Sequence, residues 1–309
     1  MSTDIHEQIR KAVAAVPQWP ETRELSYSPL GGGLSNSNWL LRRDGQDYVL
    51  KIFGAGSDAF VDRALSYIAV NQAHAIGISP GVIHYDQLHR AEFIEYLAGY
   101  RASLSADFVR PDFCSRVVNL YKQFNATKML PTTKTVFDMT EEHLAQGDAL
   151  NVIRPSDFPF LLEQYNHAKA AFMASGLDLA PCHNDPMPGN FMVRMSDDDR
   201  IDDMKLIDFE FASNNERAYE LGVFLAEVFV DEATSLELIE EYYGTASPAY
   251  VARVTVARAV ADMKWGSWAV QQRQASDWDY DFQKYGIWKY ARARRVFNDP
   301  RWTQWLRTI

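Results

Sequence analysis

The stretch Cys182-His-Asn-Asp-Pro-Met-Pro-Gly-Asn-Phe-Met-Val193 carries His183, Asp185 and Asn190 in the spacing H-x-D-x4-N. Eighteen residues beyond Asn190, a short apolar strand runs into Asp208-Phe209-Glu210. Loop aspartates and asparagines often do no more than bond to their own backbone. A histidine, a carboxylate and an amide at this spacing, followed by an apolar strand that ends in a second carboxylate, instead favour a reactive site.

The residue types of this stretch suit the transfer of a phosphoryl group. Such a transfer needs one carboxylate that orients the attacking hydroxyl and takes its proton, and hard oxygen ligands that hold Mg²⁺ on the nucleotide phosphates. We expect Asp185 to be the catalytic carboxylate and His183 to brace its loop. Asn190 and Asp208 are expected to bind the magnesium ion.

A second group of candidates lies near the N-terminus, where Leu30-Gly-Gly-Gly-Leu-Ser-Asn-Ser-Asn38 leads into a strand. Glycines let backbone amides approach phosphate oxygens, and serine and asparagine side chains add donors. Three glycines alone are more often a flexible turn, but a lysine follows on the next strand, where its ammonium could reach the same phosphates. The sequence therefore predicts a nucleotide phosphate site made by Gly32, Gly33, Ser35, Asn36 and Lys51.

The spacing of apolar residues divides the chain into two parts. Residues 25–96 read as strands, with a hairpin turn at Asp44-Gly45 and one helix over 58–76, for which Ser57 is the expected N-cap and Gly77 the residue past the end. Helical spacing predicts further helices over 3–16, 112–124, 159–175, 219–230, 235–243 and 247–275. We predict an α+β fold in two lobes: an N-lobe over 1–96, with a small antiparallel sheet and one helix, and a larger, mainly helical C-lobe over 97–309.

Composition excludes several classes of protein. The 309 residues carry a net charge of −10, which argues against a broad nucleic-acid footprint. Two cysteines cannot form a disulfide framework, and neither a signal peptide nor a membrane-spanning run is visible, so we expect a cytoplasmic protein without membrane insertion. The oligomeric state is left open, a homodimer included.

These motifs resemble the kinase-like fold of small-molecule kinases, and specifically the choline/ethanolamine kinase branch of the aminoglycoside phosphotransferase group. The resemblance covers nearly the whole chain. Residues 31–36 look like the phosphate loop of that family, residues 48–52 like its lysine strand and residues 92–95 like its lobe hinge. It implies ATP and Mg²⁺ as cofactors, with the adenine against the hinge backbone near Phe93 and Glu95.

The branch assignment rests on the segment Met263-Lys-Trp-Gly-Ser-Trp268, whose two tryptophans lie on one helix face. Aromatic faces bind a quaternary ammonium through cation–π attraction, although tryptophans at helical spacing more often pack in the core. In choline kinases a Trp-x-x-Trp pair, later aromatic residues and an acidic residue enclose the substrate. By this resemblance the residues that bind a small cationic alcohol are Glu227, Trp265, Trp268, Tyr280 and Tyr285.

One position departs from the family pattern. Relatives place a glutamate on the N-lobe helix to pair with the strand lysine, and Ser66 occupies that position here. Asp62, one turn earlier, is expected to pair with Lys51 instead, and whether Ser66 impairs activity is left open.

The expected activity is therefore ATP- and Mg²⁺-dependent phosphorylation of choline or ethanolamine. Kinases of another cationic alcohol, such as an aminoglycoside or thiamine, and a nucleotide-binding pseudokinase stay open as alternatives. A protein kinase is disfavoured because no Ala-Pro-Glu element follows Asp208-Phe209-Glu210.

Overall fold

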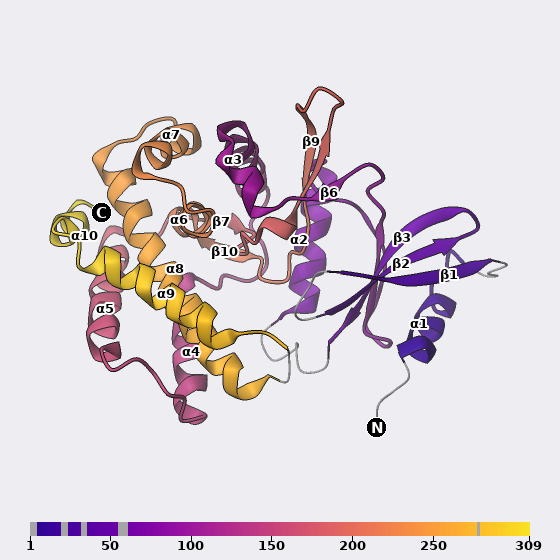
Figure 1. The fold of residues 1–309 in the computed structure, drawn as a ribbon, viewed down its shortest axis with the longest axis horizontal. Helices are drawn as coiled ribbons and strands as arrows, with labels where there is room; N and C mark the ends of the chain where they lie inside the picture. Colours follow the sequence, from indigo (N-terminus) through magenta and orange to yellow (C-terminus); the bar gives the residue numbers. More distant parts are fainter. Residues whose placement is uncertain (1–4, 20–23, 32–35, 55–60, 277–278) are drawn as a thin grey trace. The chain divides into compact units, whose positions relative to one another are not determined.

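The computed structural model describes residues 5–19, 24–31, 36–54, 61–276 and 279–309. The chain divides into two compact units, one of Met1–Ser103 with Gly189–Phe211 and one of Leu104–Pro188 with Ala212–Ile309. Figure 1 shows the sheet-rich first unit and the mainly helical second unit, which confirms the predicted fold class.

The first unit is built on a five-stranded antiparallel sheet. Its strands follow the order β1-β2-β3-β5-β4. Their bounds are β1 Leu25–Leu30, β2 Asn36–Arg43, β3 Gln46–Phe53, β4 Val82–Asp86 and β5 Ala91–Glu95. Asp44 and Gly45 have φ of 50° and 78° and join β2 to β3. Two central residues with positive φ are what a tight hairpin requires, so the predicted turn is confirmed.

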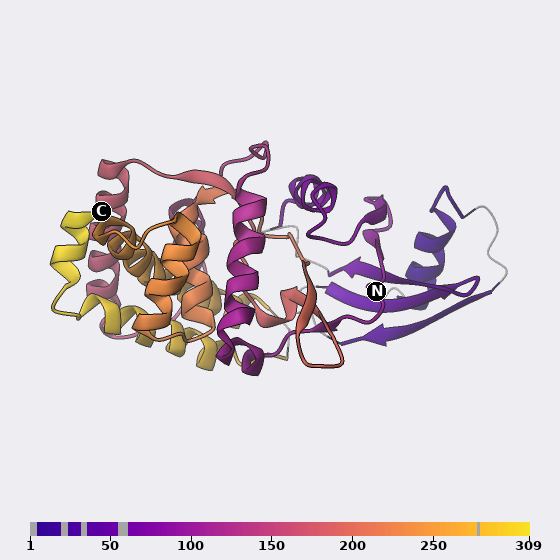
Figure 2. The same cartoon turned by 90° about the horizontal axis from the view of Figure 1, so that it is seen from above.

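Helix α1 (Ile5–Ala14) buries its apolar stripe against one face of this sheet (Figure 2). Ile9, Ala12 and Val13 are its buried residues, and they belong to one core with strand residues such as Leu50 and Phe93. This side of the sheet is therefore closed by the helix that the N-terminal periodicity predicts.

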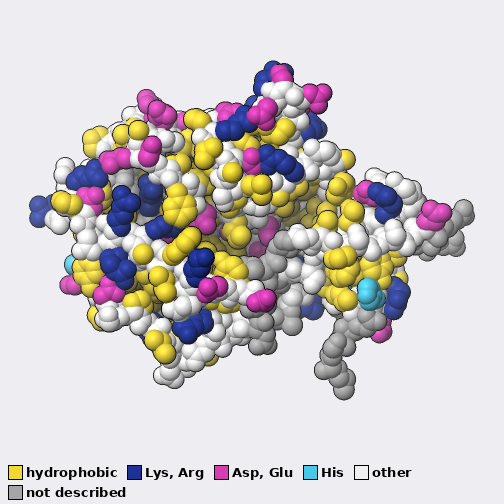
Figure 3. All heavy atoms as spheres, viewed as in Figure 1, with side chains coloured by type: hydrophobic (Ala, Val, Ile, Leu, Met, Phe, Trp, Pro, Cys, Tyr) yellow, Lys and Arg dark blue, Asp and Glu magenta, His cyan; other side chains and the backbone are white. Residues whose placement is uncertain are grey.

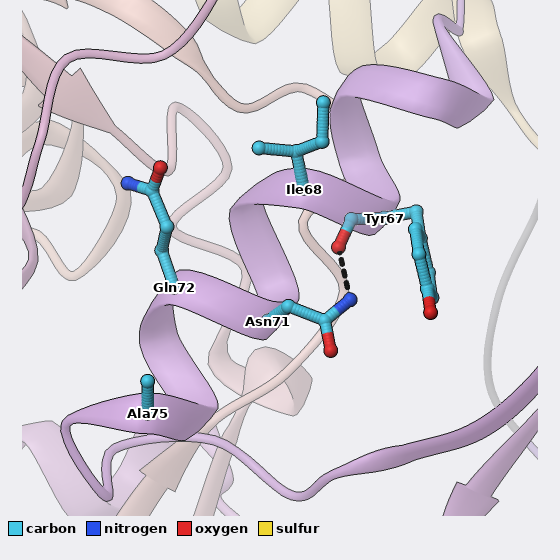
Figure 4. A pocket seen from close by; sticks show the side chains of 5 residues that line it. All are labelled: Tyr67, Ile68, Asn71, Gln72 and Ala75. Atoms are coloured by element: carbon cyan, nitrogen blue, oxygen red, sulfur yellow. Dashed lines mark hydrogen bonds between the residues drawn. The ribbon is translucent and has the colours of Figure 1, made fainter.

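Helix α2 (Arg63–Ala75) begins later than the predicted range of 58–76. Its N-cap is Asp62, whose carboxylate accepts from the amide of Leu65 at 3.0 Å, and Gly77 follows the helix with φ of 80°. The predicted N-cap, Ser57, lies outside the described residues. A pocket lies along α2 (Figure 4), lined by Tyr67, Ile68, Asn71, Gln72 and Ala75. None of these five residues is among the predicted site residues.

A three-stranded sheet in the order β6-β8-β9 completes the first unit. Its strands are β6 Arg101–Ala102, β8 Phe191–Met195 and β9 Ile201–Leu206. The amide of Leu206 also donates to the carbonyl of Ile78 at 2.8 Å. The expected division at residue 96 therefore differs from the compact units, because the β8–β9 hairpin is held by segments of the N-terminal part.

The second unit consists of helices around a two-stranded sheet. The antiparallel pair is β7 (Leu179–Cys182) and β10 (Ser213–Glu216), with Cys182 opposite Ser213. Short 3₁₀ helices cover Ser105–Val109 and Pro188–Asn190. The helices are α3 Pro111–Asn125, α4 Val136–Ala149, α5 Phe158–Ser175, α6 Arg217–Glu227, α7 Glu232–Tyr243, α8 Pro248–Ala275, α9 Phe282–Phe297 and α10 Trp302–Thr308.

The five helices predicted for this unit are confirmed to within a few residues, whereas α4, α9 and α10 were not predicted. Helix α8 is buried on most of its circumference, and α9 lies beside it (Figure 1). Gly266 allows this close packing, because a Cβ there would meet Cε1 of Tyr290 at 2.8 Å.

No helix among the described residues is both long enough and apolar enough to span a membrane. On the face shown in Figure 3, basic and acidic side chains are interspersed over the helical unit.

Candidate active site

Lys51 lies on β3 and is paired with two carboxylates of the segment after β9. Its Nζ is 2.8 Å from Oδ1 of Asp208 and 3.3 Å from Oε1 of Glu210. The prediction that Asp62 pairs with Lys51 is wrong, since the carboxylate of Asp62 caps α2 instead. The strand lysine thus finds its partners within the Asp-Phe-Glu motif rather than on the helix.

Glu210 is the centre of this charged cluster. Oε1 of Glu210 accepts from Lys51, from Asn36 and from Nη1 of Arg63, the last at 2.6 Å. The other guanidinium nitrogen of Arg63 donates to Oδ1 of Asn36 at 3.2 Å, and the group stacks on Phe53. Sequence reasoning placed Arg63 inside the predicted helix over 58–76 and did not assign a role to it.

The pKa values of the cluster follow from burial and mutual charge. Burial alone would lower the pKa of Lys51, but nearby carboxylates outweigh it and raise that pKa. Burial would raise the pKa of Glu210, yet the cations Lys51 and Arg63 bring it down to about 2. For Asp208 burial prevails and the pKa is raised, and for Glu92 it prevails to give a pKa of about 6.

Two of the predicted site residues fit the requirements of a magnesium site. Asp208 has φ of 66°, and the amide next to it, of Ile207, donates to the carbonyl of Asn190 at 2.9 Å. This backbone hydrogen bond holds Asn190 and Asp208 close together, and the side chains of both offer hard oxygen donors. Three carboxylates (Glu92, Asp208 and Glu210) also face only two cations, so the cluster has one negative charge in excess when all are ionised.

Of the other residues predicted to bind the nucleotide, the structure describes only some. Gly32, Gly33 and Ser35 lie outside the described residues. The Phe93 ring is fully buried in the sheet core, and Oε2 of Glu95 accepts from the amide of Gly81 at 2.7 Å. Both residues thus have structural roles, and their contact with adenine stays a prediction.

In the second unit, Asp185 is held on a tightly braced loop. It is 9% exposed, and its amide donates to Nδ1 of the fully buried His183 at 3.3 Å. Asn184 between them has φ of 69°, a left-handed conformation that asparagine tolerates better than most residues. Its amide group bonds with Ser213 and with Asn215, both at 3.0 Å. These contacts fix the backbone on both sides of the predicted catalytic carboxylate.

Glu220 on α6 supports the same loop and was not identified from the sequence. Its carboxylate is fully buried and accepts from the amide of His183 and from Nδ2 of Asn125, the latter at 2.6 Å. Burial raises the pKa of Glu220 to about 7 although these hydrogen bonds lower it. The only signal in the sequence was a glutamate set among the apolar residues 221–226 and their neighbours in this helix.

The predicted acceptor residues do come together within the second unit. Trp265 and Trp268 lie edge to face with ring centroids 5.5 Å apart, and the Trp268 and Tyr285 centroids are 5.9 Å apart. Tyr280 continues the chain of rings, 5.9 Å from Tyr285. Both tryptophans are about 5% exposed, so they are also core residues.

Two lysines that sequence reasoning did not consider are part of this ring cluster. Nζ of Lys264 is 3.0 Å from the centroid of the Trp265 ring. Nζ of Lys289 is 4.6 Å from the centroid of Tyr285 and forms an ion pair with Glu227. Burial lowers the pKa of Lys264 well below its ordinary value, while the charge of Asp185 opposes this shift and that of Lys289 adds to it.

Comparison with known proteins identifies relatives. Residues 26–253 match the model of the phosphotransferase enzyme family. An ethanolamine kinase of Saccharomyces cerevisiae is 24% identical over 70% of this chain and 49% of its own length. A choline/ethanolamine kinase of Rattus norvegicus is 25% identical over 69% of this chain and 58% of its own length. The chain thus spans between about half and three fifths of the length of these curated relatives.

Solved structures show the same fold. A choline/ethanolamine kinase family protein from Mesorhizobium loti superposes with a TM-score of 0.82 at 25% identity, covering 99% of both chains. The choline kinase LicA from Streptococcus pneumoniae superposes with a TM-score of 0.77 at 18% identity, covering 96% of this chain and 99% of its own. Since the family model spans well over half of the sequence, the chain belongs to the phosphotransferase enzyme family, and it is similar to that family's choline/ethanolamine kinases.

Proposed function

We propose that this protein transfers the γ-phosphoryl group of ATP to the hydroxyl of a small alcohol. The observation that carries the proposal is the loop of Asp185, whose backbone is held by His183, Asn184 and Glu220 in a chain of the phosphotransferase family. A loop fixed by buried hydrogen bonds on both sides of one carboxylate is typical of a group whose position matters for chemistry.

In the proposed reaction the acceptor oxygen attacks the γ-phosphorus and a new O–P bond forms. The bond from that phosphorus to the β–γ bridging oxygen breaks, ADP leaves, and the hydroxyl proton passes to Asp185. Lys51 binds phosphate oxygens. To do so, its ammonium group gives up part of its ion pair with Asp208. Asn190 and Asp208 would hold Mg²⁺, which would neutralise charge on the phosphates.

Two observations bear on the acceptor. The names of the relatives and the ring cluster of Trp265, Trp268, Tyr280 and Tyr285 support an amino alcohol such as choline or ethanolamine. The two lysines within that cluster oppose a cationic head group. Phosphorylation of an alcohol is therefore the proposed function, with choline and ethanolamine as the first acceptors to test.

The experiment is an acceptor panel with ATP and Mg²⁺, in which ADP release is measured and the phosphorylated product is identified by ³¹P NMR. The panel contains choline, ethanolamine, an aminoglycoside, thiamine, and uncharged and carboxylated short alcohols. Formation of a phosphate monoester on one of them supports the proposal. ATP hydrolysis without ester formation, or nucleotide binding without any turnover, would contradict it and favour a pseudokinase.

A further inference from the structure

The ring cluster of the second unit already contains positive groups of the protein itself. Nζ of Lys264 covers one face of Trp265 at 3.0 Å, and Nζ of Lys289 lies 4.6 Å from the Tyr285 centroid. Both lysines are at most 3% exposed, so these are packed positions and not chance surface contacts. A trimethylammonium group would need the same ring faces, whatever the protonation state of the lysines.

The carboxylate predicted to attract a cation is also neutralised. Glu227 is in an ion pair with Lys289, and Nη2 of Arg292 lies 3.7 Å away. Arg292 is itself paired with the buried Asp262, at 3.0 Å between Nε and Oδ2. Among the described residues, Lys289 and Arg292 thus pair with the two carboxylates Glu227 and Asp262, and Lys264 adds a third basic group on the Trp265 ring. Both carboxylates are therefore already paired with cations of the protein, and with Lys264 protonated these five described groups sum to one positive charge, which Asp185 balances.

Trp268 adds a donor that a quaternary ammonium cannot use. Its Nε1 is buried and has no hydrogen-bond acceptor among the described residues. An indole N–H only donates, and a buried donor without an acceptor is costly. A trimethylammonium group has no lone pair to offer, whereas a carboxylate or phosphate oxygen does.

From these contacts we infer that the acceptor of the proposed phosphotransfer carries an anionic group, such as a carboxylate, and that Lys264 and Lys289 bind it in the ring cluster. This inference rests on the proposed function, the phosphorylation of a hydroxyl. It assigns a negative charge to the other end of the substrate, where choline and ethanolamine carry a positive one. The charge of Asp185 raises the pKa of Lys264 against the effect of burial, in keeping with a short separation between the proposed acceptor site and Asp185. A short hydroxy acid is therefore the matching substrate class.

Three compounds of the form HO–CH₂–CH₂–X isolate the charge of the head group: 3-hydroxypropanoate, 3,3-dimethylbutan-1-ol and choline. The last two have nearly the same shape and differ in charge. We expect kcat/KM to fall in the order carboxylate, neutral, ammonium, with at least ~10-fold between the first and the last. Lys264→Met and Lys289→Met should each reduce use of 3-hydroxypropanoate by about 10-fold and improve use of choline.

Lys284→Met, at an exposed lysine on α9, is the matched control and should leave the order unchanged. Binding of the three compounds, followed by calorimetry, gives a readout that does not need turnover. If the carboxylate binds best and no ester is formed, the inference stands and the proposed function fails. Choline as the best wild-type ligand, an unchanged preference for 3-hydroxypropanoate over choline in both lysine variants, or no binding of any of the three would overturn the inference.

Discussion

Replacing Glu220 with glutamine tests whether burial keeps this carboxylate, which supports the loop of Asp185, close to neutrality. Glu220 accepts from the backbone of His183 and from Asn125, and its pKa is raised from 4.5 to about 7 because burial disfavours the charge. Glutamine keeps the shape and an acceptor oxygen but cannot ionise. The variant should therefore keep the fold, and the contribution of Glu220 ionisation to the pH dependence of the free energy of unfolding should be lost.

The magnitude follows from linkage. A folded-state pKa about 2.5 units above the unfolded value corresponds to about 3 kcal/mol, at about 1.36 kcal/mol per unit. The group takes up its proton more readily in the folded state, so its contribution is fully present below pH ~4.5 and lost as the pH rises to ~7. Between pH 5 and 8 the free energy of unfolding of the wild type should thus fall by about 2 to 3 kcal/mol more than that of Glu220→Gln.

Urea unfolding from pH 5 to 9, followed by tryptophan fluorescence, measures this difference. Glu237→Gln, which changes an exposed carboxylate on α7, is the control and should parallel the wild type. If the free energies of unfolding of wild type and Glu220→Gln stay parallel over the whole pH range, the reasoning is refuted. The pKa of Glu220 would then be the same in the folded and unfolded states.

Two further substitutions test the first unit. Asp62→Ala should cost about 1 kcal/mol of stability through the lost N-cap and leave the KM for ATP within about twofold; a large rise in that KM would restore Asp62 as the partner of Lys51. Asp208→Ala should abolish activity and weaken binding of Mg·ATP more than binding of metal-free ATP, because it removes a carboxylate ligand. Equal losses with and without magnesium, measured by calorimetry, would argue against metal coordination by Asp208.

Much of the fold could be predicted because turn residues and the spacing of apolar residues can be recognised within a short segment of sequence. The Asp44-Gly45 turn needs two residues with positive φ, and the apolar spacing of 248–275 continues for a long buried helix. Helix α4 (Val136–Ala149) was missed because its apolar residues are few and interrupted by charges. Its buried face is defined by packing within the helical unit, which one segment does not reveal.

The same distinction applies to the site residues. The spacing of His183, Asp185 and Asn190 was visible in the sequence because the residues share one loop. The pairing of Arg63 with Glu210 joins positions 147 residues apart and was not visible. Lysines in helices normally extend into solvent, so the burial of Lys264 and Lys289 against aromatic rings could be recognised only from the tertiary structure.

Single-turnover phosphoryl transfer by Asp185→Asn is the measurement that tests the central claim most directly. With labelled ATP, Mg²⁺ and the best acceptor of the panel, the variant should be slower than the wild type by at least ~10², because the proton acceptor is lost while the shape is kept. Nucleotide affinity should stay within about twofold, and Asp197→Asn, at an exposed aspartate, should behave as the wild type. A variant Asp185→Asn that transfers the phosphoryl group at a near-normal rate would contradict the account.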